Sequence, residues 1–141
     1  MRCEEVMKKD VECVSPQDMV QAAARRMRDE NVGFLPVCDR SRKVLGVVTD
    51  RDLAIRILAE GKPASTRVEE VMTREVVACH PEDDLRRAEE LMMKNHVSRM
   101  LCVDADGRLV GVISLSDIAQ QEDAGHAART MRGVSEREAT A

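Results

Sequence analysis

The chain has 141 residues, of which 43% are hydrophobic and 34% charged, a formal net charge of −4, and one aromatic side chain, Phe34. This length is typical of a single domain. The negative charge argues against nucleic-acid and anionic-membrane partners, and the scarcity of aromatic faces excludes a base-stacking platform for single-stranded nucleic acid.

The sequence also bears on location. No apolar run approaches the length of about 18 residues that a membrane span needs. The N-terminal residues 1–5 lack the apolar centre of a signal peptide. We therefore expect no membrane span and a cytoplasmic protein.

There are 5 cysteines, without any C-x-x-C spacing, and this odd number in a reducing compartment predicts free thiols. Four of them lie in apolar, strand-like stretches, where we interpret them as small buried hydrophobes: Cys13, Cys38, Cys79 and Cys102. A metal or redox role is the alternative. Because Cys79-His80 would supply only two of the ligands that zinc needs, no metal site is predicted.

The chain repeats itself with a step of 65 residues and without a gap between Glu4 and Leu53. The step carries Val6-Met7 onto Val71-Met72, Pro16 onto Pro81, Val32 onto Val97, Asp39 onto Asp104, Gly46-Val47 onto Gly111-Val112, and Asp52 onto Asp117. Such a period indicates a repeated supersecondary unit. We expect repeat 1 at residues 1–60, a linker at 61–67, repeat 2 at 68–121 and a tail at 122–141.

In the first repeat, residues 11–14 predict a short strand, and Ser15-Pro16 predicts the start of a helix with Pro16 at its first position. Ser15 with Asp18 resembles a capping box. Apolar residues at helical spacing extend this helix over residues 18–31. Two further strands and a last helix follow at residues 34–38, 44–49 and 50–60, with a hairpin loop at 39–42.

The second repeat has the same order. The pattern predicts a strand at 76–79, a helix opened by His80-Pro81 over 83–96, strands at 100–103 and 109–114, and a helix at 115–121. Each repeat is thus β-α-β-β-α. The predicted fold class is α/β (α+β), with the two repeats as a pseudo-twofold pair and a tail that is a short helix or disordered.

A hydroxyl and a carboxylate lie three residues apart where each last helix begins, as Thr49 with Asp52 and as Ser114 with Asp117. This is the spacing of a capping box, in which the two side chains only complete the helix start. The alternative is a ligand site, in which the carboxylate accepts the hydroxyls of a ribose and the helix start faces a phosphate. Both interpretations can hold together.

These paired endings, Gly46 to Leu53 and Gly111 to Ile118, together with the repeated Val-Met, Pro and Asp positions, resemble a tandem pair of cystathionine β-synthase (CBS) domains, a Bateman module. The resemblance covers about residues 1–121. It implies clefts between the repeats that bind adenosine-containing ligands such as AMP, ADP, ATP, NAD or S-adenosylmethionine.

The resemblance also implies roles for single residues. Asp52 and Asp117 would each hold a ribose, with Thr49, Ser114 and Ser116 beside the phosphates. Arg99, in Val97-Ser98-Arg99, would reach a phosphate in the cleft of Asp52, where Arg51 could add charge if it is not simply solvated. Phe34 occupies the place of Arg99 in the first repeat, so the Asp117 cleft would lack this cation and would prefer an adenosine ligand with less charge, or bind none. Adenine would lie near Val14-Ser15 and Cys79-His80.

We expect a regulatory sensor that signals through an unknown effector protein, requires no cofactor and is not an enzyme, since no nucleophile–base set or nucleotide fingerprint is visible. A homodimer would cover the apolar faces of its helices. Two alternatives stay open: an adaptor homodimer with vestigial clefts, and a metal- or redox-responsive protein that uses Cys79 and His80. The sequence does not name the ligand, the effector or the role of residues 122–141.

Overall fold

The structure is a computed structural model, and it describes residues 1–121 and 130–135. The chain forms two compact units. The first-repeat unit is Glu12–Val76, and the second-repeat unit joins Met1–Val11 to Val77–Ala141. The N-terminal segment thus packs with the second repeat rather than with the repeat that follows it in the sequence.

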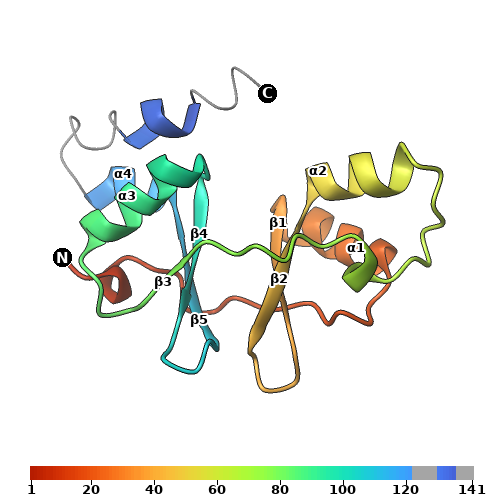
Figure 1. The fold of residues 1–141 in the computed structure, drawn as a ribbon, viewed down its shortest axis with the longest axis horizontal. Coiled ribbons are helices and arrows are strands. Elements are labelled where there is room, and N and C mark those ends of the chain that lie inside the picture. Colours follow the sequence, from red (N-terminus) through yellow and green to blue (C-terminus); the bar gives the residue numbers. More distant parts are fainter. Residues whose placement is uncertain (122–129, 136–141) are drawn as a thin grey trace. The chain divides into compact units, whose positions relative to one another are not determined.

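The first-repeat unit is built around a two-stranded hairpin (Figure 1). Its elements are α1 (Val20–Glu30), β1 (Phe34–Cys38), β2 (Val44–Thr49), α2 (Asp50–Asp52), η2 (Leu53–Leu58) and η3 (Val68–Glu70). β1 and β2 are antiparallel, with Phe34 opposite Thr49. The apolar face of α1 packs against the hairpin with Val20, Ala23 and Met27, as amphipathic helices do.

The second-repeat unit has a three-stranded sheet of order β3-β4-β5, with β3 parallel to β4 and β4 antiparallel to β5. Its elements are η1 (Cys3–Glu5), β3 (Ala78–Cys79), α3 (Leu85–Asn95), β4 (Arg99–Val103), β5 (Leu109–Ser114) and α4 (Leu115–Gln121). Residues 130–135 are helical. Thr130 and Val134 are buried, and His96 Nδ1 lies 2.9 Å from the carbonyl oxygen of Gly133.

The repeated glycines mark a close approach of two segments in each unit. A Cβ on Gly46 would lie 2.6 Å from the carbonyl oxygen of Thr73, and one on Gly111 would lie 3.0 Å from that of Lys8. In both units this is where the segment after the 3-10 helix forms an isolated bridge with the sheet, Thr73 with Val47 and Lys8 with Val112. The repeat therefore keeps glycine because a side chain would push this segment off the strand.

The mixed α+β fold is confirmed, but both long helices begin later than the sequence predicts. α1 begins at Val20 and α3 at Leu85, so neither Pro16 nor Pro81 is the first helical residue. The Ser15 amide donates to the Asp18 carboxylate at 2.9 Å, as the His80 amide does to Asp83 at 2.9 Å. The expected capping pair thus closes a turn, and the helix starts after it.

The predicted first strands are also shorter than expected. In residues 11–14 only Val14 forms a bridge, with Val37, and β3 occupies residues 78–79 of the predicted 76–79. The helix predicted at 50–60 ends at Leu58, as α2 followed by the π-helical η2.

None of the helices within the described residues is long and apolar enough to cross a membrane. Part of the predicted tail, residues 122–129 and 136–141, lies outside the described residues.

Candidate functional site

The two hydroxyl–carboxylate pairs form the capping boxes that their spacing predicts. In the first-repeat unit, the Asp52 amide donates to Thr49 Oγ1 at 3.1 Å and the Thr49 amide donates to Asp52 Oδ2 at 3.0 Å. In the second-repeat unit, the Asp117 amide donates to Ser114 Oγ at 3.2 Å and the Ser114 amide to Asp117 Oδ2 at 3.0 Å. Each pair satisfies two amides that a helix start leaves without a partner.

Asp52 has two further neighbours that the sequence did not indicate. Thr73 Oγ1 lies 3.4 Å from Asp52 Oδ1 and 3.5 Å from Oδ2. Arg56 Nε lies 3.9 Å from Oδ1, and Arg56 Nη1 donates to the carbonyl oxygens of Val71 and Met72 at 2.9 and 3.3 Å. The i, i+4 spacing of Asp52 and Arg56 is a signal that could have found this ion pair. Thr73 is distant in sequence, and only the fold brings it here.

The surroundings of Asp117 are different. The step of 65 residues places Lys8 where the first repeat has Thr73, and Gln121 where it has Arg56. Ser116 is exposed, and its Oγ lies 2.9 Å from Ser114 Oγ. The two carboxylates thus begin helices in the same way but have different neighbours.

Each carboxylate keeps acceptor capacity for a ligand. An ionised carboxylate has two oxygens and about four lone-pair directions. Asp117 uses Oδ2 for the Ser114 amide. Asp52 uses Oδ2 for the Thr49 amide, and its contacts with Thr73 are long. The vicinal hydroxyls of a ribose are two donors that such a carboxylate can accept together, so capping and sugar binding are compatible at both positions.

Phe34 and Arg99 occupy the same place in their strands, as the repeat predicts. Phe34 lies opposite Thr49 in the first hairpin, and Arg99 lies opposite Ser114 in the second. Arg99 is exposed and Phe34 is half-buried. Arg51 is exposed too. Arg99 belongs to the unit that holds Asp117. Its predicted contact with a phosphate in the cleft of Asp52 therefore stays a prediction from the resemblance.

The residues predicted to surround adenine lie on or next to the two segments that pair in parallel with β1 and β4. Val14 is buried and bridges Val37, and Ser15 follows it with Oγ donating to Gln17 at 2.8 Å. In the second-repeat unit, Cys79 is buried opposite Cys102. His80 is exposed, and its Nδ1 lies 2.9 Å from the carbonyl oxygen of Val103.

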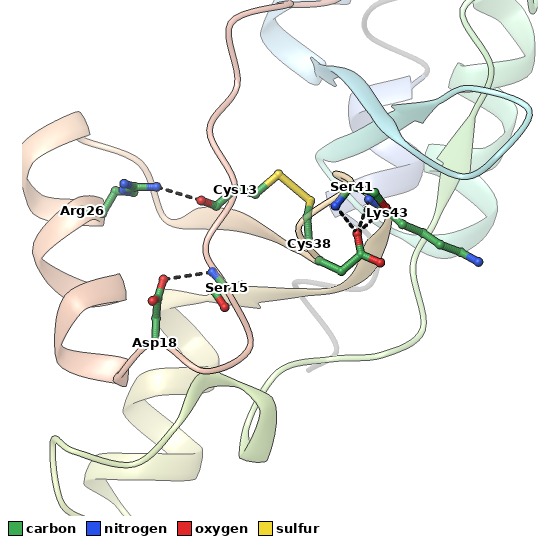
Figure 2. Close-up of a disulfide and its surroundings, with 8 residues drawn as sticks. Cys13, Ser15, Asp18, Arg26, Cys38, Ser41 and Lys43 are labelled. Atoms are coloured by element: carbon green, nitrogen blue, oxygen red, sulfur yellow. Dashed lines mark hydrogen bonds between the residues drawn. A yellow bond between two sulfur atoms is a disulfide. The ribbon is translucent and has the colours of Figure 1, made fainter.

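A disulfide between Cys13 and Cys38 corrects the prediction that all five thiols are free (Figure 2). Their Cα atoms are 5.7 Å apart, within the range that a disulfide spans. The cause is the parallel pairing of their segments, in which the Val14 amide donates to Pro36 and the Cys38 amide donates to Val14. Arg26 Nη1 fixes the same segment by donating to the Cys13 carbonyl oxygen at 2.9 Å.

The other three cysteines are free, as predicted, and Cys79 and Cys102 are buried, as predicted too. Cys3 is also buried, which the sequence analysis did not predict. Cys79 Sγ lies 3.2 Å from Cys102 Sγ. Hydrogen bonds from the Cys102 and Cys79 thiols lower the pKa of Cys3 to about 4. The same contacts with Cys3 raise the pKa of Cys102 to about 12, and contacts with Cys102 and Cys3 raise the pKa of Cys79 as well. All three residues belong to the buried core cluster of the second-repeat unit.

Comparison with known proteins agrees with this architecture. The sequence matches the family model described as CBS domain at residues 3–59 and 68–124. It is 38% identical over 115 residues to the CBS domain-containing protein YhcV of Bacillus subtilis (strain 168). This match covers 82% of this chain and 81% of YhcV.

Two solved structures are similar throughout most of the chain. Hypoxic Response Protein I with two coordinated zinc ions has a TM-score of 0.78 and 28% identity, and the match covers 87% of this chain and 100% of that one. The CBS domain pair of protein MJ0100 in complex with 5′-methylthioadenosine and S-adenosyl-L-methionine has a TM-score of 0.77 and 26% identity, and the match covers 86% and 94%.

Proposed function

Since the chain belongs to the CBS-domain family and carries two such domains in tandem, we propose that it is a regulatory module that binds an adenosine-containing ligand. The observation that carries this proposal is the pair of carboxylates at Asp52 and Asp117, each anchored by one main-chain amide and each with acceptor capacity left. The MJ0100 domain pair was solved with two ligands that share an adenosine ribose, which supports ribose as the common element.

The proposed roles follow from the chemistry of each group. Asp52 and Asp117 accept ribose hydroxyls. The hydroxyls of Thr49, Ser114 and Ser116 hydrogen-bond to polar groups beyond the ribose, and Arg99 provides the positive charge that a phosphate needs. Val14-Ser15 and Cys79-His80 offer main-chain groups and apolar surface to adenine. The ligand acts by favouring one conformation over another, and an effector protein reads the change.

The test is a titration with AMP, ADP, ATP, NAD and S-adenosylmethionine, followed by calorimetry and thermal unfolding, of the native chain and the variants Asp52→Asn and Asp117→Asn. Asparagine keeps an oxygen that can accept the capping amide but has one acceptor fewer and no charge. Loss of a charge-assisted hydrogen bond weakens binding by about ten- to a hundredfold. A ligand at 100 times its Kd raises the free energy of unfolding by about 2.7 kcal/mol.

The outcomes separate the two interpretations of the capping pairs. Normal thermal stability with weakened binding in one variant assigns the ligand to that carboxylate. Full-affinity binding in both variants would reject the ribose role. Arg99→Ala, titrated alongside, is expected to weaken the phosphorylated ligands and to leave S-adenosylmethionine unchanged.

The second candidate is an adaptor homodimer. Three large apolar side chains of the first-repeat unit are exposed, Met19 by 47%, Ile55 by 45% and Leu58 by 81%. A protein surface with such side chains suits a partner. If none of the five ligands binds and the protein is a stable dimer, the adaptor function replaces the sensor.

A further inference from the structure

Cys79 and Cys102 bring two free thiols together in the core of the second-repeat unit. The two residues lie directly opposite each other on the parallel strands β3 and β4, and their Sγ atoms are 3.2 Å apart. Both side chains are buried, 2% and 0% exposed. Neighbouring strands lie about 4.8 Å apart, which is within the Cα separations that a disulfide spans. A bond between the two sulfur atoms therefore requires a shift of the side chains and no rearrangement of the strands.

The first repeat carries valine at both of these positions. The step of 65 residues pairs Cys79 with Val14 and Cys102 with Val37, and Val14 bridges Val37 in parallel just as Cys79 pairs with Cys102. Val14 and Val37 are 3% and 0% exposed, and both belong to the core of their unit. Because valine satisfies these positions, packing alone does not account for a sulfur atom at each of them. The pair of cysteines points to thiol chemistry instead.

The first repeat also has a closed disulfide between the same two segments. The Cys13–Cys38 bond joins the segment before α1 to β1 (Figure 2). The second repeat has Ala78 and Val103 at these places, and its two cysteines are the residues adjacent to them. This arrangement of segments thus accepts a disulfide, which is closed in the first repeat and open in the second.

We infer that the Cys79–Cys102 pair is a site of oxidation by a hydroperoxide, which converts the two thiols into a disulfide that joins β3 to β4. One sulfur atom attacks an oxygen of hydrogen peroxide and breaks the O–O bond, which gives a sulfenic acid, and the released hydroxide leaves with the thiol proton as water. The second thiol attacks the sulfenic sulfur, and its proton leaves with that hydroxyl group as a second water molecule. The two sulfur atoms lose two electrons, and the two peroxide oxygens gain them.

Access to the buried pair follows the edge of the sheet. β3 consists of two residues and lies at the edge of the order β3-β4-β5. A short segment with few main-chain hydrogen bonds opens at a lower free energy than the core of a unit. Burial in apolar surroundings disfavours the thiolate, which is the form that attacks a peroxide. We therefore expect slow oxidation of the native chain, at a rate that the opening of β3 determines.

The test treats the purified chain with hydrogen peroxide and without a reductant, so that the Cys13–Cys38 disulfide stays closed. The number of free thiols, measured after denaturation, should fall from three to one. Digestion with trypsin under non-reducing conditions should then yield peptides 75–86 and 100–108 joined by a disulfide, since they contain Cys79 and Cys102. The peptide map replaces the intact mass as the readout, because peroxide also adds oxygen to the 9 methionines.

The first repeat supplies the matched variants. Cys102→Val takes the residue of the first repeat, and it should form no cross-link and keep both of its free thiols. Cys3→Val also takes the residue of the first repeat, and it should form the cross-link as the native chain does. Cys13→Ala with Cys38→Val should form it too, and the thermal midpoint of this variant should rise on oxidation, because the new disulfide closes a loop, and fall again with dithiothreitol.

Three results on the native chain would overturn the inference, and they hold even if a variant does not fold. The first is three intact thiols in a chain whose exposed Met19 has been oxidised. The second is a disulfide of peptide 3–8, which contains Cys3, in place of the Cys79–Cys102 bond. The third is oxidation of the thiols to sulfinic acids without a cross-link. Each readout is obtained without an adenosine ligand, so a failure of this inference is distinguishable from a failure of the proposed function.

Discussion

Arg56 connects the helix after β2 to the end of η3. Its Nη1 donates to the carbonyl oxygens of Val71 and Met72 at 2.9 and 3.3 Å, although 49% of its side chain is exposed. These carbonyls follow a short 3-10 helix, where main-chain acceptors lack partners. A cation that donates to two of them therefore fixes the position of Thr73, which contacts Asp52.

We expect Arg56→Ala to lower the free energy of unfolding by about 1 kcal/mol, because hydrogen bonds from a charged donor are lost at a partly solvated place. Chemical denaturation measures this change. Arg51→Ala is the matched control, since Arg51 is exposed, and it should change the value by less than about 0.5 kcal/mol. Equal effects of the two substitutions would mean that the contacts of Arg56 do not contribute.

The site residues were predictable only where the sequence keeps them close. Thr49 with Asp52 and Ser114 with Asp117 are local pairs, so their spacing sufficed. Thr73 reaches Asp52 from 21 residues away, and no local pattern reports a contact of that kind. The assignment of Arg99 to a phosphate has no local signal either, and it rests on the resemblance until the variant is measured.

Among the secondary-structure elements, the hairpins and α4 were predicted well and the helix starts were not. β1, β2, β5 and α4 have the predicted bounds, because polar loop residues and capping pairs limit them on both sides. The starts of α1 and α3 were placed too early, because Ser15 with Asp18 has the same spacing whether it caps a helix or closes a turn. Only the long-range pairing of neighbouring segments decides between these conformations.

The disulfide ties the segment before α1 to β1, and it encloses a loop of 25 residues. In the chain-entropy model, closing a loop of this size stabilises the folded state by about 3.5 kcal/mol. We therefore expect reduction by a dithiol to lower the midpoint of chemical denaturation. The double variant Cys13→Ala, Cys38→Val should show the lower midpoint without reductant and no further change with it. A native chain that is insensitive to reduction would show that the disulfide adds no stability.

For the whole molecule, the repeat was the most informative feature of the sequence. A gapless step of 65 residues predicted two similar units, and each unit has the same hairpin followed by a capped helix. The repeat did not indicate that Met1–Val11 packs with the second repeat. A period describes which segments are alike, whereas the partner of each segment is decided by packing.

The exposed apolar residues of η2 are candidates for the contact in the predicted homodimer. Ile55 and Leu58 lie on one helical turn of η2, 45% and 81% exposed. Burying a leucine against a partner contributes about 1.5–3 kcal/mol, and an isologous interface uses each residue twice. Leu58→Glu should therefore weaken the dimer by at least about tenfold, as measured by sedimentation equilibrium. Met131→Glu, at a residue that is 49% exposed on the helical residues 130–135, should leave it unchanged. If Leu58→Glu associates as the native chain does, η2 lies outside the interface, and the exposed side chains of this helix become candidates for the contact with the effector protein.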